Sequence, residues 1–248
     1  MSAASMLHSR DFTDLSEVHM NIKILELIDG AKQAEGLTVV IDVLRAFSLE
    51  VCLFAQGAEK IYPIGDMNEA FALKAEHPDW LLFGERGGAM VEGCDYGNSP
   101  TGIAGIDFTG KTLIHSTSAG TQGIVNATGA DEIITGSLLN ARAIAEYIKK
   151  KNPETVSFCA MGNAGVRRAN EDVLCAEYIK SILLGHPMPD IKERARELEW
   201  NGAEHFFNEN TQHIYPKPDF FKCIEVNSYD LVIRVDRDKD GRYVATRV

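Results

Sequence analysis

Carboxylates and arginines beside apolar runs are the residues of this sequence best suited to chemistry. Asp42 and Arg45 fall at the end of the apolar run LTVVIDVL, residues 37–44, and directly after it. A carboxylate inside an apolar strand is costly unless it is paired or binds a metal, so Asp42 is either the partner of a nearby arginine or a metal ligand or nucleophile. Glu85 and Arg86 lie between glycines in GERGG, where a backbone can approach a ligand closely, although a turn with a solvated ion pair explains them equally well.

Hydroxyl and amide side chains fill the turns that follow other apolar runs. The turn STSAGTQG at 116–123 places hydroxyls and glycines before an expected helix, where backbone N–H groups can hold an anion; a plain strand-to-helix turn is the alternative. YGNSP at 96–100 and GSLLN at 136–140 offer further polar groups, although the latter also suits a helix cap. The predicted substrate-binding residues of these turns are Asn98, Ser99, Ser116, Thr117, Ser118, Gly120, Thr121, Ser137 and Asn140.

The segment GNAGVRRANED, residues 162–172, brings two arginines and two acids together. Glu171 and Asp172 fall in the first turn of an expected helix, where acids also stabilise the helix dipole without any further role. Carboxylates suit Mg2+ and arginine suits phosphate or sulfonate, so the combination indicates metal-assisted chemistry on an anion. The predicted metal ligands are Asp42, Glu85, Glu171 and Asp172, the predicted catalytic residues are Asp42, Arg45, Glu85 and Arg86, and Arg167 joins the predicted substrate-binding residues.

Short apolar runs alternate with segments of helical period along most of the chain. The runs indicate strands at 37–44, 60–64, 80–83, 111–115, 132–135 and 155–161. The alternation predicts an α/β fold with a mainly parallel sheet and crossover helices. Ligands bind beyond the carboxyl ends of the strands in such sheets, so we expect Asp42, Glu85, residues 116–121 and Glu171 to meet in one cleft.

The two ends of the chain differ from this pattern. Residues 191–209 are charged and predicted to be helical, and a change of composition near residue 186 suggests a subdomain boundary. Two runs, 229–235 and 242–247, flank the turn Asp240-Gly241 and predict a C-terminal antiparallel hairpin at an edge of the sheet. Residues 1–19 are expected to be a partly disordered leader, and residues 20–248 the folded domain.

Charge, hydropathy and cysteine content disfavour several classes of function. A formal net charge of -11 repels phosphate backbones and anionic lipid, which disfavours nucleic-acid and membrane partners. No apolar run approaches the ~18 residues of a membrane span. The five cysteines form no zinc-binding pattern, which favours buried thiols in a reducing cytoplasm.

Six motifs occur in one order along most of the chain: VVIDVLRA at 39–46, GERGG at 84–88, YGNSP at 96–100, a Thr/Ser-rich turn ending in Gly120-Thr121, GSLLNA at 136–141 and EDVLCA at 171–176. In order and spacing they resemble the 2-phosphosulfolactate phosphatase (ComB) family. The resemblance implies the family's own α/β fold and Mg2+-dependent hydrolysis of (R)-2-phospho-3-sulfolactate to sulfolactate and phosphate. In organisms that make coenzyme M, this is a biosynthetic step.

The chain departs from that family and from other phosphatases at identifiable positions. Phe47-Ser48 follows Ala46 where the family has Thr-Thr or Thr-Ser, and Ala119 stands where it has Asn. These departures leave the exact substrate open. Asp42 is followed by Val43-Leu44 rather than by the x-Asp of haloacid dehalogenase-like enzymes, and the chain has no Cys-x5-Arg or Arg-His-Gly motif.

The resulting hypothesis is an in-line displacement at phosphorus in a small, multiply anionic metabolite, with Mg2+ on the carboxylates. The nucleophile is either water or Asp42. A dinucleotide-dependent oxidoreductase is disfavoured because no GxGxxG follows the first expected strand. A non-catalytic protein that binds an anionic metabolite on the same scaffold is the alternative, and the sequence leaves the oligomeric state open.

Overall fold

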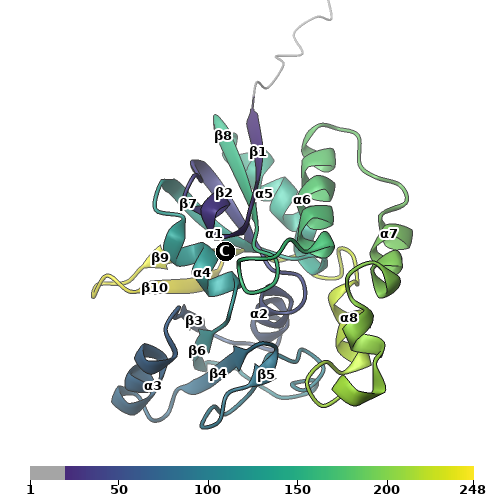
Figure 1. Cartoon of the computed structure of the whole chain (residues 1–248). Helices are drawn as coiled ribbons and strands as arrows, with labels where there is room; N and C mark the ends of the chain where they lie inside the picture. Colours follow the sequence, from purple (N-terminus) through teal and green to yellow (C-terminus); the bar gives the residue numbers. More distant parts are fainter. Residues whose placement is uncertain (1–19) are drawn as a thin grey trace, which may run out of the picture.

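The computed structural model describes residues 20–248, and within them a ten-stranded sheet runs through the molecule (Figure 1). The order of the strands is β1-β8-β2-β7-β9-β10-β3-β6-β4-β5. Their bounds are β1 Asn21–Glu26, β2 Gly36–Ile41, β3 Lys60–Pro63, β4 Leu81–Arg86, β5 Ala89–Met90, β6 Thr112–Ser116, β7 Ala130–Gly136, β8 Thr155–Ala160, β9 Ile233–Arg237 and β10 Tyr243–Arg247. The α/β class, the mainly parallel sheet and the C-terminal antiparallel pair are confirmed.

The sheet consists of two parallel groups joined by the C-terminal hairpin. Strands β1, β8, β2 and β7 are parallel to one another, as are β3, β6 and β4. The hairpin of β9 and β10 is antiparallel to β7 on one side and to β3 on the other. It therefore lies in the interior of the sheet and not at the expected edge, and the two parallel groups run in opposite directions.

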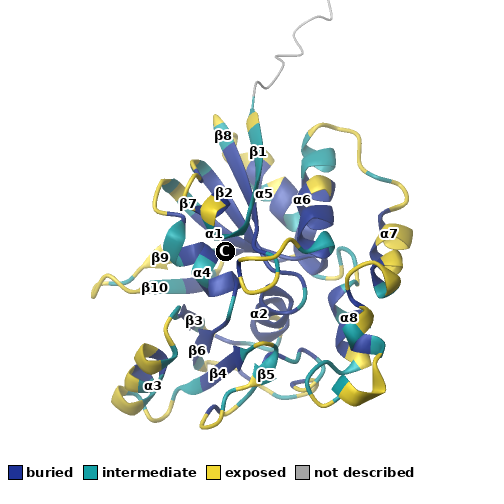
Figure 2. Cartoon of the chain, in the orientation of Figure 1, coloured by how far each residue is buried: buried dark blue, intermediate teal, exposed yellow. Residues whose placement is uncertain are grey.

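Helices cover both faces of the first strand group, as the alternation of its buried side chains requires. Val40 packs with α1 (Leu27–Ala31) and α4 (Gly120–Asn126), while Val39 and Ile41 pack with α5 (Ala141–Lys151) and α6 (Asn170–Leu183). Helix α2 (Ala46–Ala55) and helix α3 (Met67–Glu76) lie against the second group. Buried residues run along the strands and the inner sides of these helices, and the exposed residues gather outside them (Figure 2).

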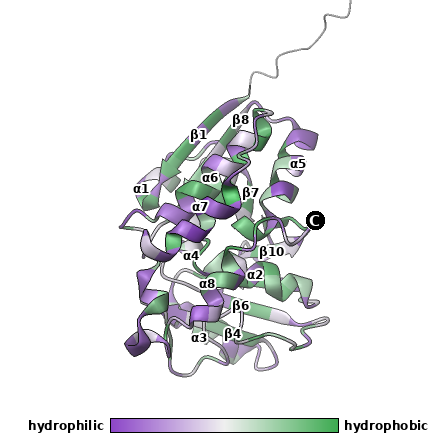
Figure 3. Ribbon diagram, turned by 90° about the vertical axis from the view of Figure 1, so that its right-hand side faces the viewer, coloured by the Kyte–Doolittle hydropathy of each residue, from purple (hydrophilic) through white to green (hydrophobic). Residues whose placement is uncertain are grey.

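The region beyond residue 186 folds against the same core as the first strand group. Ile191, Phe206 and Phe220 are buried in one cluster with Phe158 of β8. The expected helix over 191–209 is only partly present, because α7 (Ile191–Glu197) gives way to the 3-10 turns η2 (Leu198–Trp200), η3 (Glu204–Phe207) and η4 (Glu209–Thr211) before α8 (Lys217–Cys223). Figure 3 shows that most of α7 is hydrophilic.

Local sequence accounts for the start of helix α3. Asp66 caps α3 by accepting hydrogen bonds from the backbone N–H groups of Asn68 and Glu69, as its position before the helix predicts.

All five cysteines are free and buried. Among the described residues, no helix has the length and apolarity to cross a membrane. The predicted leader, residues 1–19, lies outside the described part of the chain.

Candidate active site

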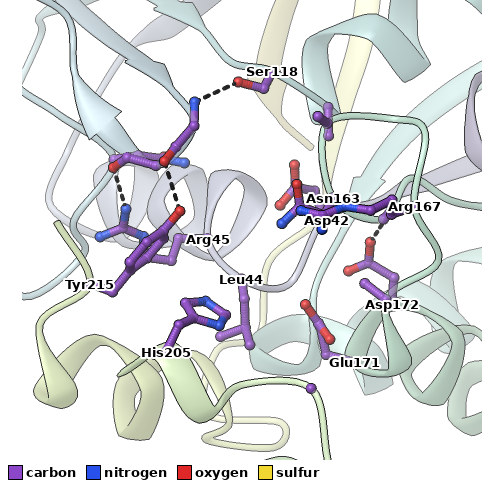
Figure 4. A pocket seen from close by; sticks show the side chains of 18 of the residues that line it. Asp42, Leu44, Arg45, Ser118, Asn163, Arg167, Glu171, Asp172, His205 and Tyr215 are labelled. Carbon is purple, nitrogen blue, oxygen red and sulfur yellow. Dashed lines mark hydrogen bonds between the residues drawn. The ribbon is translucent and has the colours of Figure 1, made fainter. Parts of the chain in front are cut away.

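A cavity of about 340 Å³ is lined by segments that follow strands of both parallel groups (Figure 4). Its walls come from the residues after β2, the end of β4 with the following glycine turn, the turn after β6, the segment between β8 and α6, and the η3–α8 region. Four carboxylates and three guanidinium groups line it: Asp42, Glu85, Glu171, Asp172, Arg45, Arg167 and Arg168. Charge therefore dominates the chemistry of this cavity.

Asp42 directly follows β2 and is buried in the cavity wall. Its Oδ1 accepts a hydrogen bond of 3.2 Å from the Ala46 backbone N–H. A Cβ atom on Gly120 would come within 3.0 Å of Oδ2 and within 2.9 Å of the Phe47 ring, so only glycine fits beside this carboxylate. Burial first, and then the negative charges of Asp172 and Glu85, raise the pKa of Asp42 to about 8. A cation beside Asp42 would relieve this cost and favour the ionised form.

Glu171 and Asn98 present oxygens that have no partner in the described part of the chain. Glu171 lies in the first turn of α6, and its Oε2 is buried without a hydrogen bond. Burial, and after it the charge of Asp42, raises the pKa of Glu171 to about 7. The side-chain oxygen of Asn98 is also buried and unpartnered. Buried polar atoms normally have partners, so these two oxygens indicate a ligand that the chain itself does not supply.

The other two carboxylates are held by backbone N–H groups. Asp172 accepts from the Val43 N–H at 2.8 Å through Oδ1 and from the Gly162 N–H at 2.7 Å through Oδ2. It thereby joins the segment after β2 to the segment after β8, while burial first and then Glu171 raise its pKa well above the ordinary value. Both residues that it joins line or adjoin the cavity, so Asp172 sets the spacing of two of its walls.

Glu85, like Asp172, joins two segments of the cavity wall through hydrogen bonds from backbone N–H groups. Its Oε1 accepts from the Ser118 N–H at 2.6 Å, and its Oε2 accepts from the Gly88 N–H at 2.7 Å. The carboxylate joins the turn after β4 to the turn after β6. Of the four predicted metal ligands, Asp42 and Glu171 are therefore the two whose oxygens are least occupied by the protein.

The oxygen donors of the cavity fit Mg2+ if water and substrate complete its coordination shell. No group of three or more His, Cys, Asp or Glu side chains within residues 20–248 is arranged to hold a metal ion. Mg2+ commonly binds through one or two carboxylates, with waters and substrate phosphate completing its shell, and it does not need a cage made by the protein alone. Asp42 and Glu171, with the unpartnered Asn98 oxygen, supply hard oxygen donors of this kind.

Arg45 is tied into a buried network and is not free to bind an anion with its whole guanidinium group. Nη1 donates to Asp219 Oδ2 at 2.8 Å, and Nη2 donates to the Gly88 carbonyl at 2.7 Å. The guanidinium carbon lies 5.3 Å from the centre of the Tyr215 ring, and the Tyr215 hydroxyl donates to the Gly87 carbonyl at 2.7 Å. Arg45 and Tyr215 together hold the glycine turn against the cavity, as Figure 4 shows.

The arginines of the segment between β8 and α6 differ in their surroundings. Arg168 forms a 3.0 Å ion pair with Glu26 and donates to the Asn170 side chain at 2.8 Å. Arg167 is exposed, and no carboxylate of the described residues lies within 4.0 Å of its guanidinium group. A closed turn holds Arg167, since its N–H donates to the Asn163 carbonyl at 3.1 Å and its carbonyl accepts from the Asn163 N–H at 2.8 Å. This guanidinium group is thus available to an anionic ligand.

The turn at 116–121 does not form the open anion cradle that the sequence suggested. The Thr117 N–H donates to the Thr121 hydroxyl and the Thr121 N–H donates to the Thr117 hydroxyl, while the Ser118 N–H is bound by Glu85. Of this turn only Ser118 and Ala119 line the cavity, and Gly120 borders Asp42. The N–H groups of Thr117, Ser118 and Thr121 are therefore already bound within the fold.

Four other predicted residues also lie outside the cavity lining. Arg86 donates to the Ser116 hydroxyl at 3.0 Å and to backbone carbonyls. The Ser99 hydroxyl donates to Asp219 Oδ1 at 2.8 Å. Ser137 and Asn140 form a capping box before α5, which is the alternative that their turn left open. The predicted site residues that do line the cavity are Asp42, Arg45, Glu85, Asn98, Ser118, Arg167, Glu171 and Asp172.

Sequence reasoning missed the contribution of the η3–α8 region. His205 and Tyr215 line the cavity, and the buried carboxylate of Asp219 holds Arg45 from this side. Asp219 precedes Phe220-Phe221 in the sequence, so it is an acid beside an apolar pair. The rule that singled out Asp42, that a carboxylate among apolar residues needs a partner, would have indicated Asp219 as well.

Known proteins resemble this chain over most of its length. Residues 22–238 match the family model described as 2-phosphosulpholactate phosphatase. A probable 2-phosphosulfolactate phosphatase of Bacillus subtilis (strain 168) is 31% identical over 204 residues, which are 82% of this chain and 88% of the relative. One of Carboxydothermus hydrogenoformans is 39% identical over 177 residues, 71% and 73% of the two chains. One of Clostridium acetobutylicum is 30% identical over 232 residues, 90% and 92% of the two chains.

Proposed function

The chain belongs to the 2-phosphosulpholactate phosphatase family, and we propose that it hydrolyses 2-phosphosulfolactate or a similar phosphorylated 2-hydroxy acid with the help of Mg2+. The products are the free 2-hydroxy acid, here sulfolactate, and phosphate. Five free, buried cysteines are in keeping with a reducing cytoplasm as the place of this reaction.

One observation carries the proposal: Asp42 and Glu171 line one cavity with raised pKa values, and Glu171 has an oxygen without a partner. In their ionised form these carboxylates would repel a multiply anionic substrate if nothing lay between them. A divalent cation removes the conflict, because it is attracted to both the carboxylates and the phosphate. The charge of the site and the charge of the proposed substrate therefore both favour a divalent cation.

The residues of the chain divide the work as follows in this proposal. Asp42 and Glu171 hold the ion, which would neutralise charge that develops on the phosphate oxygens. The exposed guanidinium group of Arg167 binds a second anionic group of the substrate, a carboxylate or sulfonate. Arg45, Asp172 and Glu85 act through their hydrogen bonds on the cavity walls, which keeps the reacting groups oriented. Water attacks phosphorus in line with the leaving oxygen; attack by Asp42 is the alternative.

Phosphate release from a small panel of substrates tests this function. The panel contains 2-phosphosulfolactate, 2-phospholactate and 3-phosphoglycerate, each with Mg2+ and with EDTA. We expect phosphate release that needs Mg2+ and is fastest for a substrate with a phosphate on the 2-hydroxyl group. No release from any substrate would favour a metabolite-binding protein, and full release in EDTA would remove the ion from the reaction.

A further inference from the structure

His205 is an imidazole in the cavity wall for which the fold shows no other use. It lies in η3 and is half-buried. Its ring packs 4.5 Å from the Tyr215 ring and 4.6 Å from the Phe206 ring, measured between centroids, so its orientation is set by aromatic contacts. No hydrogen bond joins either ring nitrogen to another described residue. Figure 4 shows the imidazole beside Leu44, with Tyr215 and Arg45 on one side of it and Glu171 on the other in this view.

The surroundings of His205 keep it in the neutral form. Burial first, and then the positive charge of Arg45, lower the pKa of His205 below its ordinary value, while Glu204 on the same turn opposes this weakly. Tyr215 faces the ring as a neutral phenol, because burial raises the pKa of its hydroxyl group. Glu171 and Asp172 line the same cavity. A neutral imidazole has one ring nitrogen with a lone pair, which can accept a proton.

The other polar side chains of the cavity are less suited to accept a proton. Asp172 and Glu85 already accept two or more hydrogen bonds from the protein. Asp42 and Glu171 are committed to the cation in the proposed function. Arginines remain protonated in proteins and cannot act as bases. Of the described residues that line the cavity, His205 is the remaining one with a basic nitrogen.

We propose that His205 is the general base of the hydrolysis, a role that rests on the proposed function. In this step a water oxygen bonds to phosphorus, the bond between phosphorus and the 2-oxygen of the hydroxy acid breaks, and a proton of the water moves to the imidazole. The leaving alkoxide takes a proton from solvent, and the imidazolium returns its proton to solvent. No oxidant, reductant or further reactant is needed.

The test compares His205→Ala with His213→Ala. His213 lies in the same region of the chain but is exposed and does not line the cavity, so it controls for the substitution. We expect kcat/KM of His205→Ala to fall by at least ~10²-fold, the usual contribution of a general base, with KM nearly unchanged. Added imidazole should restore part of kcat in His205→Ala, since the lost group is a proton acceptor. His213→Ala should match the wild type.

Substrates with different leaving groups separate a base from an acid. A base acts on the attacking water, so the loss in His205→Ala should be similar for an alkyl phosphate and for an aryl phosphate with a good leaving group. A loss confined to the alkyl phosphate would mean that His205 protonates the leaving oxygen, which overturns the assignment as base. Unchanged kcat in a folded His205 variant, or a loss in His205→Ala that imidazole does not restore, would also overturn it.

The outcome remains informative if the alanine variant is poorly folded or the proposed function fails. His205→Gln keeps more of the ring's volume but cannot accept a proton. It should therefore show the same loss of kcat, and added imidazole should not restore it. The change in melting temperature on addition of Mg2+ reports whether the cation site is intact in each variant. An active wild type with active His205 variants contradicts only the base, whereas an inactive wild type contradicts the proposed function.

Discussion

At the scale of single residues, the hydrogen bonds of the four cavity carboxylates separate two kinds of acid. Asp172 and Glu85 accept backbone N–H groups from two different segments each, which makes them structural. Asp42 and Glu171 each keep an oxygen to which no backbone N–H of another segment donates, which suits cation ligands, whereas a raised pKa is common to these two acids and Asp172. Glu171 and Asp172 are neighbours in sequence but have different roles. Their shared position in the first turn of a helix does not reveal this difference.

Substitutions of Glu171 and Asp172 test whether the first is a cation ligand and the second a structural acid. Glu171→Gln removes a charge from an unpartnered oxygen, so it should weaken Mg2+ binding and leave the melting temperature of the cation-free protein unchanged or higher. Asp172→Asn places an NH2 group against one of two N–H donors, which should cost about 1–3 kcal/mol of unfolding free energy. Calorimetry with Mg2+ and thermal unfolding in EDTA measure the two effects. A destabilised Glu171→Gln together with an Asp172→Asn that loses the ion would contradict these roles.

The raised pKa of Asp42 also predicts how stability depends on pH. The folded-state pKa is about 8 and the ordinary value is about 3.9, so the folded state retains a proton that the unfolded state releases. This contribution to stability is present below about pH 4 and is lost as the pH rises to about 8. Without a divalent cation, the melting temperature of the wild type should therefore fall more steeply from pH 5 to pH 8 than that of Asp42→Asn. Identical slopes would contradict the raised pKa.

At the scale of elements, the carboxyl ends of two opposed strand groups meet at one cavity. The sequence predicted most of these strands from their apolar runs, and from this it predicted the convergence of Asp42, Glu85 and Glu171. It did not show that the groups run in opposite directions, because strand order depends on contacts between distant segments. Five steps separate β2 from β6 in the sheet. At about 20–25° per step the twist amounts to about 100–125°, which turns the opposed ends towards each other.

Two glycines of the turn after β4 test whether its packing shapes the cavity. A Cβ on Gly88 would lie 2.4 Å from the Tyr215 ring, whereas a Cβ on Gly87 would meet nothing within 4 Å; both residues have positive φ. Gly88→Ala should therefore cost at least ~1 kcal/mol more stability than Gly87→Ala, and it should lower kcat/KM more. Thermal unfolding and phosphate release on both variants check this. Equal effects would show that the contact with Tyr215 does not shape the site.

At the scale of the whole molecule, the η3–α8 region joins the two strand groups across the cavity. Its Asp219 is fully buried and binds Arg45, Ser99 and Thr101, residues from two other segments. The sequence predicted a charged helix that covers only the start of this region, up to residue 209, and no part in the site. Composition could not show which of its few buried residues reach the cavity, since a run of 3-10 turns lacks the period that marks one face of a helix.

Removing the charge of Asp219 should affect the whole fold. Asp219→Asn leaves Arg45 buried without its partner, which should cost about 3–5 kcal/mol of unfolding free energy. Asp190→Asn breaks an exposed ion pair with Arg194 and should change stability little. Denaturant unfolding compares them, and a near-neutral Asp219→Asn would show that the buried pair is not needed to hold this region in place.

The catalytic role of Asp42 is tested on one preparation of Asp42→Asn, with kinetics measured in Mg2+ and thermal unfolding measured without it. The substitution keeps the size of the side chain and deletes its charge. We expect kcat/KM for the best phosphorylated 2-hydroxy acid to fall by at least ~10²-fold, which is about 2.7 kcal/mol of transition-state stabilisation. The melting temperature in the absence of the ion should be unchanged or higher. A variant that retains activity within a few fold of the wild type but unfolds at a lower temperature would contradict the assignment of Asp42 to catalysis.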